Sequence, residues 1–233
     1  MDTLECIKTR RSIRKFLDLP LPRDILTNIV DAGRYAPSSG NLQDWKFVVV
    51  LKPDLIKKVA EACLQQYWME SAAAIVIVCS EPEKNKRFYG LRGERLYTIQ
   101  DCAASAQNIL LTAHSLGVGA CWVGAFDEDM IKRTFGIPDE VRPQAIIALG
   151  YADEKVPVPP KYPIEIVFYF NRWRGRIEDV DKYLGYTSVK IAQGVEKGKE
   201  LAKKAGASLS EKGRALASKL KSHLKEKLRR RKK

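Results

Sequence analysis

Two kinds of hydrophobic pattern alternate along the chain. Apolar residues that recur every three or four positions predict helices, and short apolar runs rich in β-branched residues predict strands. The predicted helices cover residues 2–10, 22–35, 53–64, 95–116 and 127–136, and the predicted strands cover residues 45–51, 72–80, 144–151 and 164–170. Strands that alternate with helices in this way indicate an α+β or α/β sandwich, and they argue against a helix bundle or a β-barrel.

Some of these segments carry more information than their type. The short, mostly apolar runs at 45–51 and 72–80 predict strands that are buried on both faces. The helix at 95–116 is apolar on more than one face, so we expect it to be a central scaffold element or to lie at a subunit interface. Residues 152–163 are rich in proline and should run extended over the surface. The strand that follows can then complete the sheet of its own subunit or that of a partner.

Composition limits the class of protein. A chain of 233 residues suits one domain of ordinary size plus an appendage. No apolar run approaches the ~20 residues of a transmembrane helix, and the N-terminus is charged where a signal peptide would be apolar, so we expect a cytoplasmic protein. Five cysteines without CxxC spacing predict buried thiols. Two histidines are too few to build a metal site unaided.

The net charge of +13 is distributed unevenly. Residues 1–186 hold 25 Lys and Arg against 24 Asp and Glu, whereas residues 187–233 hold 16 against 4. We therefore divide the chain into a neutral domain, 1–186, and a basic tail, 187–233. Leucines at helical spacing predict a basic amphipathic helix in the tail, which several glycines weaken. The alternatives are a solvated, partly disordered tail, a peripheral helix on an anionic membrane surface, and, less favoured, a nucleic-acid contact.

Three segments concentrate groups that suit a flat, phosphorylated ligand. Residues 9–16, TRRSIRKF, place three arginines and a serine after the first helix, and guanidinium forks suit phosphate. Residues 35–47, YAPSSGNLQDWKF, supply neutral hydrogen-bonding groups for a polyol or a heterocycle edge. Residues 117–126, GVGACWVGAF, hold glycines that let backbone approach a ring closely. Each segment alone also fits an ordinary solvated turn, so only their combination indicates function.

In this order and at this spacing, these segments and the apolar helix resemble the FMN-dependent nitroreductase family, over about residues 3–173. The resemblance implies an α+β fold, a three-layer α/β/α sandwich around a mixed, mainly antiparallel sheet. It further implies an intertwined homodimer with two FMN molecules at the interface.

The resemblance also implies which residues hold FMN. Those at the phosphate, the ribityl chain and the pyrimidine edge are Arg10, Arg11, Ser12 and Arg14. Those contributed by the other subunit along the ring and ribityl side are Pro37, Ser38, Ser39, Asn41 and Gln43. Those along the isoalloxazine, with one backbone N–H facing N5, are Trp122, Val123 and Gly124.

Two positions depart from the family pattern. The family often has an arginine, in an Arg-Lys-Pro-Leu pattern, before the last strand, where this chain has Lys161-Tyr162-Pro163-Ile164. Lys161 is therefore the candidate late phosphate ligand, with Arg172 as the alternative. Asp44 stands where the family commonly has proline, which leaves the tightness of the preceding loop open. The candidates for the substrate mouth, which also fit packing or a dimer interface, are Tyr89, Arg92 and Tyr97.

The implied activity is that of an NAD(P)H-dependent flavin oxidoreductase. A hydride passes from NAD(P)H through FMN to a nitroaromatic, a quinone or a related small oxidant in a ping-pong cycle, with NADH and NADPH both open. No side chain then acts as catalytic acid or nucleophile, and Arg14 and Gly124 tune the flavin. The alternative is a flavin-binding adapter at a membrane surface, in which the basic tail carries the function.

Overall fold

The computed structural model describes residues 1–175. The chain divides into two compact units, the first of which is Met1–Pro159 and the second of which starts at Pro160. The predicted boundary at 186/187 and the predicted amphipathic tail, 187–233, lie outside the described residues.

The first unit contains six α-helices and four strands. The helices are α1 (Thr3–Thr9), α2 (Arg23–Gly33), α3 (Pro53–Ala62), α4 (Pro82–Arg92), α5 (Thr98–Ser115) and α6 (Glu128–Phe135). The strands are β1 (Trp45–Val50), β2 (Ala74–Ser80), β3 (Gly119–Val123) and β4 (Arg142–Gly150). Short 3-10 helices cover Ser39–Asn41 and Tyr67–Ser71, and a π-helical turn covers Gly93–Tyr97. Every helix and strand predicted before residue 152 is confirmed, whereas α4 and β3 were not predicted.

The four strands form one sheet in the order β1-β2-β4-β3. Neighbouring strands are antiparallel. Val49 of β1 lies opposite Val76 of β2, and Ile75 of β2 lies opposite Ala148 of β4. One isolated parallel bridge joins Ser12 to Ala120 on β3. Among the described residues this bridge is the one parallel element of a mainly antiparallel sheet, as the resemblance implied.

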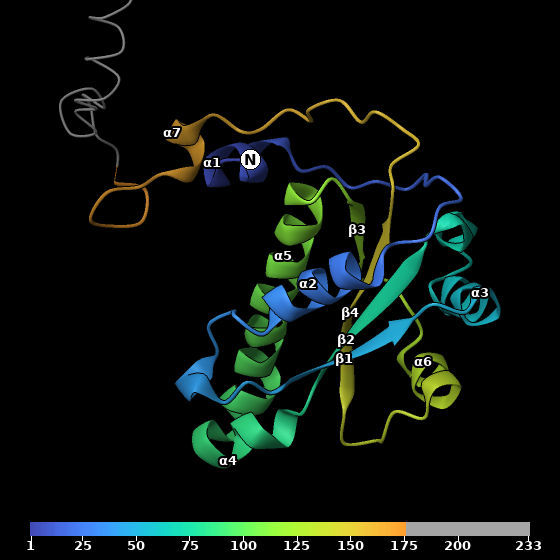
Figure 1. Ribbon diagram of the computed structural model, residues 1–233. Coiled ribbons are helices and arrows are strands. Elements are labelled where there is room, and N and C mark those ends of the chain that lie inside the picture. Colours follow the sequence, from blue (N-terminus) through green and yellow to red (C-terminus); the bar gives the residue numbers. More distant parts are fainter. Residues whose placement is uncertain (176–233) are drawn as a thin grey trace, which may run out of the picture. The chain divides into compact units, whose positions relative to one another are not determined.

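The sheet is the middle of three layers (Figure 1). Helices α2 and α5 cover one face, and α3 and α6 cover the other. On β2 the side chains alternate between the faces, so that Val76 and Val78 pack with α2 and α5 while Ile75 and Ile77 pack with α3 and α6. The fold is the predicted α/β/α sandwich, and β2 is buried on both faces as expected.

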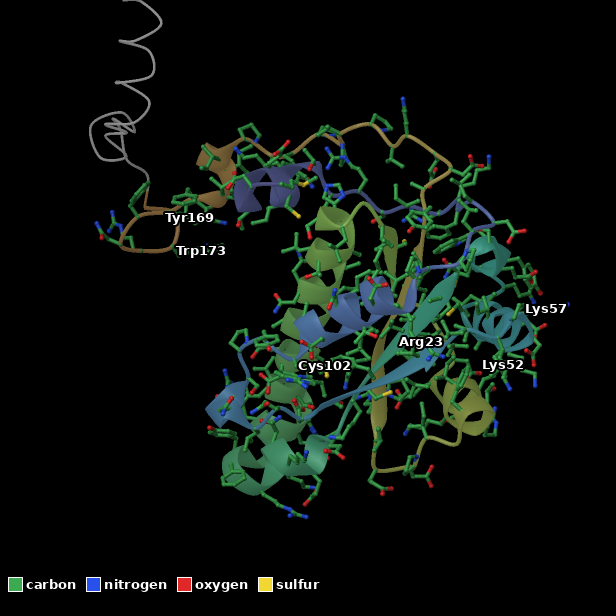
Figure 2. All side chains as sticks on the ribbon, viewed as in Figure 1. Arg23, Lys52, Lys57, Cys102, Tyr169 and Trp173 are labelled. Carbon is green, nitrogen blue, oxygen red and sulfur yellow. The ribbon has the colours of Figure 1, made fainter. Side chains whose placement is uncertain are left out.

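Helix α5 is the scaffold of the first layer. It packs against α2 and against all four strands of the sheet. Cys102 lies on its inner side, where the thiol donates to the backbone carbonyl of Cys79 at 3.6 Å (Figure 2). All five cysteines are buried and free, which confirms their prediction as buried thiols. Burial raises the pKa of Cys63 and of Cys79 to about 12, so both stay protonated at neutral pH.

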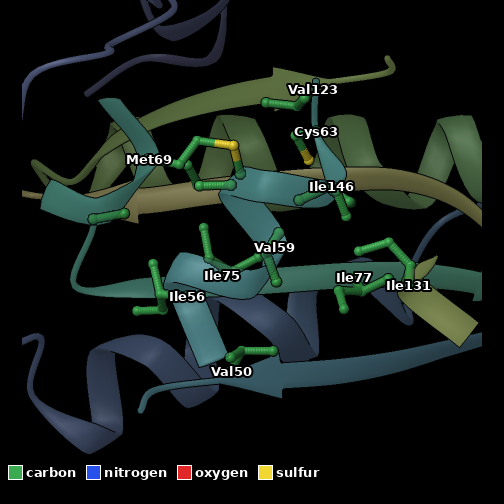
Figure 3. Close-up of a cluster of buried hydrophobic side chains, with 14 of the residues drawn as sticks. Val50, Ile56, Val59, Cys63, Met69, Ile75, Ile77, Val123, Ile131 and Ile146 are labelled. Atoms are coloured by element: carbon green, nitrogen blue, oxygen red, sulfur yellow. The ribbon is translucent and has the colours of Figure 1, made fainter. Parts of the chain in front are cut away.

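The face covered by α3 and α6 has a dense aliphatic core (Figure 3). Val59 of α3, Ile131 of α6 and Ile146 of β4 are fully buried in it. Burial of this kind stabilises a domain by roughly 25 cal/mol per Å² of apolar surface removed from water. The core therefore fixes the position of the sheet on which the candidate site is built.

Strand β1 corrects one prediction, because it is not buried on both faces. Lys46 and Val49 are exposed, and Phe47 and Val48 are only half-buried. The reason is that β1 is an outer strand of the sheet and pairs only with β2 among the described residues. A run of apolar residues carries no information on whether a strand is central or at an edge.

The described part of the second unit corrects another prediction. Residues 164–170 do not form a strand; they begin with a short helix, α7 (Ile164–Val167). The Phe168 N–H donates to the carbonyl of Ile164 at 2.9 Å. A local helical turn of this kind satisfies backbone groups that a strand would leave to a neighbour. Farther on, Tyr169 and Trp173 meet edge to face at 4.9 Å (Figure 2). Residues 152–163 form no helix or strand beyond an isolated bridge, as predicted.

Candidate functional site

The arginine segment, residues 10–16, is fixed through its backbone. The Ile13 N–H donates to the carbonyl of Ala120 at 3.0 Å, and the Asp153 N–H donates to the carbonyl of Lys15 at 2.9 Å. The side chains of Ile13 and Phe16 are buried. The segment therefore spans from β3 to the residues after β4, with its backbone held and its polar side chains on the outside.

The three arginines of this segment are placed differently. Arg10 and Arg11 are half-buried, and Arg14 is exposed. The Arg11 guanidinium donates to the carbonyls of Lys8 at 2.9 Å and Arg10 at 2.6 Å, so it also caps the end of α1. The guanidinium of Arg14 forms no hydrogen bond or ion pair within residues 1–175, and it is free to meet an anion.

The positive charges of the segment act on two neighbouring groups, and one carboxylate, Glu154, lies beside them and accepts the backbone N–H groups of Arg14 and Lys15. Burial lowers the pKa of His114, and the charges of Arg10 and Arg11 lower it further. Burial raises the pKa of Cys121, while the charge of Arg14, the Ser12 hydroxyl and the charge of Arg10 oppose this rise. The charges of Arg10 and Arg14 therefore both act at Cys121 of β3, next to the bridge between Ser12 and Ala120, which suits an anionic ligand.

The third predicted segment continues along β3 beside that spot. Trp122 is exposed, whereas the side chain of Val123 is buried in the core, so Val123 can offer a ligand only its backbone. Gly124 is exposed, and a Cβ added there would meet only the Trp122 indole, at 3.6 Å. The end of β3 is thus open for a flat molecule to approach.

The serine loop, residues 37–43, is fixed through side chains. The Ser39 N–H donates to both oxygens of Asp101, at 3.0 and 3.1 Å, and the Ser39 hydroxyl donates to Oδ1 at 3.1 Å. The Gln43 N–H donates to the Ser38 hydroxyl at 3.0 Å. Pro37 and Asn41 are exposed. The loop therefore has a defined shape with several of its polar groups at the surface.

The backbone of the serine loop is unusual. Gly40, Asn41 and Gln43 have positive φ angles of 56°, 57° and 50°. Such angles are uncommon for residues other than glycine, and they cluster at ligand sites where the surrounding structure enforces them. The loop therefore holds an energetically unfavourable backbone conformation, which is typical of a ligand-binding loop.

Asp44 anchors the far end of the loop. It is fully buried and accepts a hydrogen bond from the Thr98 hydroxyl on α5. Burial raises the pKa of its carboxyl, and the hydrogen bond from Thr98 opposes the rise. Aspartate in place of the family's proline thus leaves the loop tied to α5 at both ends.

Within one chain the arginine segment and the serine loop lie apart (Figure 1). Residues just before the arginine segment contact the C-terminal end of α5, where the Thr9 hydroxyl and His114 Nε2 are 2.8 Å apart. The serine loop contacts the N-terminal end, at Asp101. Thirteen residues of helix separate these two contacts by about 20 Å along the axis. One chain therefore does not bring the two segments together.

The candidate substrate-mouth residues form a cluster against the serine loop. The rings of Tyr89 and Tyr97 meet edge to face at 5.3 Å, and Arg92 Nε donates to the Tyr97 hydroxyl at 3.0 Å. A Cβ added to Gly40 would lie 2.5 Å from the Tyr89 hydroxyl. The cluster is therefore in direct contact with the loop, from α4 and the π-helical turn.

Lys161 and Arg172, the candidates for the late phosphate ligand, are exposed residues of the second unit. Their assignment stays a prediction. Among residues 1–175 no group of His, Cys, Asp and Glu is arranged to hold a metal ion. No helix in this part of the chain is long and apolar enough to cross a membrane.

Asp101 and Asn85 are polar residues of this region that sequence reasoning missed. Both are buried, and Asn85 Nδ2 donates to Asp101 Oδ2 at 3.4 Å. The signal that could have found Asp101 is an ionisable residue within a mostly apolar helix, because a buried charge is rarely retained without a partner.

Comparison with known proteins assigns the family. The model of the nitroreductase family matches residues 7–90 and 62–151, which contain both the arginine segment and the serine loop. The chain belongs to the nitroreductase family. A relative from Methanothermobacter thermautotrophicus, whose name proposes NADH dehydrogenase/NAD(P)H nitroreductase activity, is 40% identical over 158 residues, covering 66% of this chain and 79% of the relative.

Solved structures agree with this membership in the nitroreductase family. An FMN-dependent nitroreductase from Clostridium difficile superposes with a TM-score of 0.64 at 25% identity, covering 73% of this chain and 99% of that one. The NADPH:FMN oxidoreductase of Vibrio harveyi, solved with NAD+, gives a TM-score of 0.68 at 26% identity, covering 86% of this chain and 91% of that one. The fold implied by the resemblance is therefore confirmed.

Proposed function

We propose that this nitroreductase family member is an FMN-dependent oxidoreductase, which passes a hydride from NAD(P)H through the flavin to a nitroaromatic, a quinone or a related small oxidant in a ping-pong cycle. The observation that carries the proposal is the bridge between Ser12 and Ala120, since it puts the arginine segment alongside β3, the strand that ends at the open Gly124. A phosphate site and a site for a flat ring thereby become neighbours. The names of the relatives, which include NADPH-flavin oxidoreductase, support the same activity.

The residues present fit FMN. The phosphate of FMN is an anion, and the half-buried Arg10 supplies a cation for it at one end of the site, while the free guanidinium of Arg14 supplies a second cation for the pyrimidine edge. The open backbone at Gly124, where an added Cβ would meet only Trp122, suits the flat ring at the other end. FMN supplies the hydride chemistry when it is bound.

Each part of the chain then has a task. Arg10, Arg11 and Ser12 bind the phosphate and ribityl chain, and Arg14 places a positive charge at the pyrimidine edge, which favours the reduced, anionic form of the ring. Trp122 and the backbone of Val123 and Gly124 hold one face of the ring and offer an N–H toward N5. No side chain moves a proton in this scheme.

A homodimer completes the site. Thr9, directly before the arginine segment, and the serine loop contact α5 about 20 Å apart along its axis. A second copy therefore supplies the loop to the same flavin, with Pro37, Ser38, Ser39, Asn41 and Gln43. Positive φ angles at Asn41 and Gln43 support a binding role for this loop.

Lys161, or alternatively Arg172, is the proposed late phosphate ligand. The proposed location of the protein is the cytoplasm.

The test is the visible spectrum of the purified protein. We expect a yellow protein whose flavin absorbance bleaches when NADH or NADPH is added without oxygen and returns when menadione, a quinone, is added. A colourless protein that cannot take up FMN would contradict the proposal. Bound flavin that no nicotinamide reduces would favour the adapter alternative, in which residues 187–233 carry the function. Size-exclusion chromatography with light scattering tests the dimer.

A further inference from the structure

Asp101 is a buried carboxylate whose hydrogen bonds lead to the serine loop. It is 5% exposed and lies one turn into α5. Its two oxygens accept the Ser39 N–H at 3.0 and 3.1 Å, and Oδ1 also accepts the Ser39 hydroxyl at 3.1 Å. One carboxylate therefore fixes both the backbone and the side chain of a single loop residue.

The carboxylate is held by neutral donors. Asn85 of α4 is fully buried and donates to Asp101 Oδ2 at 3.4 Å. Among the described residues, no Lys, Arg or His forms an ion pair with Asp101. A buried carboxyl group without a salt-bridge partner depends on its hydrogen-bond donors, so the loop must keep Ser39 in place to satisfy it. We call the hydrogen bonds of Asp101 to Ser39 and Asn85 the clamp. The clamp links three elements, namely the serine loop, α4 and α5.

The clamp also explains how the serine loop maintains its positive φ angles. Gly40 and Asn41, which follow Ser39 directly, have positive φ angles. A left-handed residue other than glycine persists only where neighbouring contacts determine it. Ser39 is held by three hydrogen bonds to α5 immediately before this turn, and Gln43 closes it by donating to Ser38.

We infer that Asp101 is a positioning residue: from beneath the serine loop, it holds the polar groups of the loop at the flavin that is bound across the dimer. The inference rests on the proposed function, because the loop meets a flavin only in that dimer. Asp101 itself is buried under Ser39 and acts through it. Its removal should loosen cofactor binding and turnover while the fold is kept.

The test compares Asp101→Leu with Asp101→Asn in the full-length holoenzyme. Leucine removes both acceptors. Asparagine can present its carbonyl oxygen to the Ser39 and Asn85 N–H groups and donate its amide to the Ser39 hydroxyl, so it restores most of these contacts without charge, and the Ser39 N–H keeps one of its two acceptors. We expect the leucine variant to bind FMN about tenfold or more weakly, and the asparagine variant to stay within about threefold of the parent. Equilibrium dialysis measures the FMN dissociation constant, and the potential of the bound flavin is measured alongside it.

Ser105→Ala is the matched control. Ser105 lies one turn farther along α5, is fully buried, and its hydroxyl has no hydrogen-bond partner within the described residues. This variant should bind FMN like the parent. A parent-like affinity for Asp101→Leu, or equal losses in Asp101→Leu and Asp101→Asn, would overturn the inference. A parent that binds no FMN would instead contradict the proposed function.

A coupling measurement keeps the inference testable if Asp101→Leu does not fold. Ser39→Ala, Asp101→Ala and the double variant form a cycle, because alanine at position 101 removes both acceptor oxygens. If Asp101 acts through Ser39, the double variant binds FMN no more weakly than the weaker single variant. Fully additive losses in the cycle would overturn the inference.

Discussion

The arginine segment and the serine loop, which are the two predicted halves of one flavin site, are fixed by opposite means. The arginine segment is held mainly by backbone hydrogen bonds to the sheet and by buried apolar anchors. Of its charged side chains, Arg11 caps α1 and Lys15 pairs with Asp153, whereas the guanidinium of Arg14 is left free within residues 1–175. The serine loop is held by buried carboxylates that use its polar groups from below. In the arginine segment, the groups that fix the backbone differ from those proposed to bind FMN. In the serine loop, the same residues serve both purposes.

This difference determines how each half can fail. In the arginine segment, a polar side chain can be changed with little effect on the fold, and only an apolar anchor or its packing partner is critical for stability. In the serine loop, a buried polar group below the loop is as critical as any residue at its surface, because an unpaired buried carboxylate or hydroxyl is costly. Five substitutions sharpen this contrast.

Phe16→Ala should have the largest effect on stability. The Phe16 ring is 5% exposed and fills the space over Gly150, where an added Cβ would meet it at 2.9 Å. Loss of a buried phenylalanine costs about 3–5 kcal/mol of the free energy of unfolding, which urea denaturation measures. Leu17→Ala, at a side chain 39% exposed, is the control and should cost less than about 1 kcal/mol. Equal costs for the two variants would show that Phe16 is not the anchor.

Gly40→Ala should have a smaller effect, centred on the serine loop. The glycine has a φ of 56°, and a Cβ there would meet the Tyr89 hydroxyl at 2.5 Å. We expect a loss of about 1–2 kcal/mol in the free energy of unfolding. Gly136→Ala is a matched control, since its φ is 63° but its Cβ would meet nothing within 4 Å. If Tyr89→Phe does not recover part of the loss in Gly40→Ala, the contact with the hydroxyl is not its cause.

Arg10→Ala and Arg14→Ala should affect the flavin and not the fold. Arg10→Ala is expected to weaken FMN binding about tenfold, because it removes a charge-assisted contact to phosphate. Arg14→Ala should keep most of the flavin but lower its reduction potential, since the charge that stabilises the reduced ring is lost. Thermal melts of the apoprotein and redox titration of the holoenzyme separate the two effects. Parent-like binding and turnover in both variants would refute the assignment of the arginine segment.

Asp44→Asn should change mainly how stability depends on pH. Burial raises the pKa of the Asp44 carboxyl above its ordinary value of 3.8, so the folded state holds this proton to higher pH than the unfolded state does. Its contribution to stability is complete below that ordinary value and is lost as pH rises through the raised pKa. Asparagine keeps an acceptor for Thr98 and does not titrate. The stability of the parent relative to the variant should therefore fall from pH 4 to pH 7 in urea denaturation, and a constant difference would contradict the assignment.

The sequence by itself determined the local structure and the chemistry of the exposed groups. Apolar residues recur at helical spacing around Ile29 in α2 and around Ile109 in α5, so both helices could be predicted from their amino-acid sequence. The order of the arginine, serine and glycine segments was enough to indicate the family. These features depend on neighbours within one or two turns, which a linear pattern records.

The tertiary structure decided what depends on pairs far apart in the chain. It placed β1 at an edge of the sheet, where Val49 is exposed, and it replaced the last predicted strand with α7. It also joined Ser39 to Asp101 and Ile13 to Ala120. Sixty or more residues separate the members of each pair, and no periodicity links them; only the packing of α5 and the sheet brings them within hydrogen-bond distance.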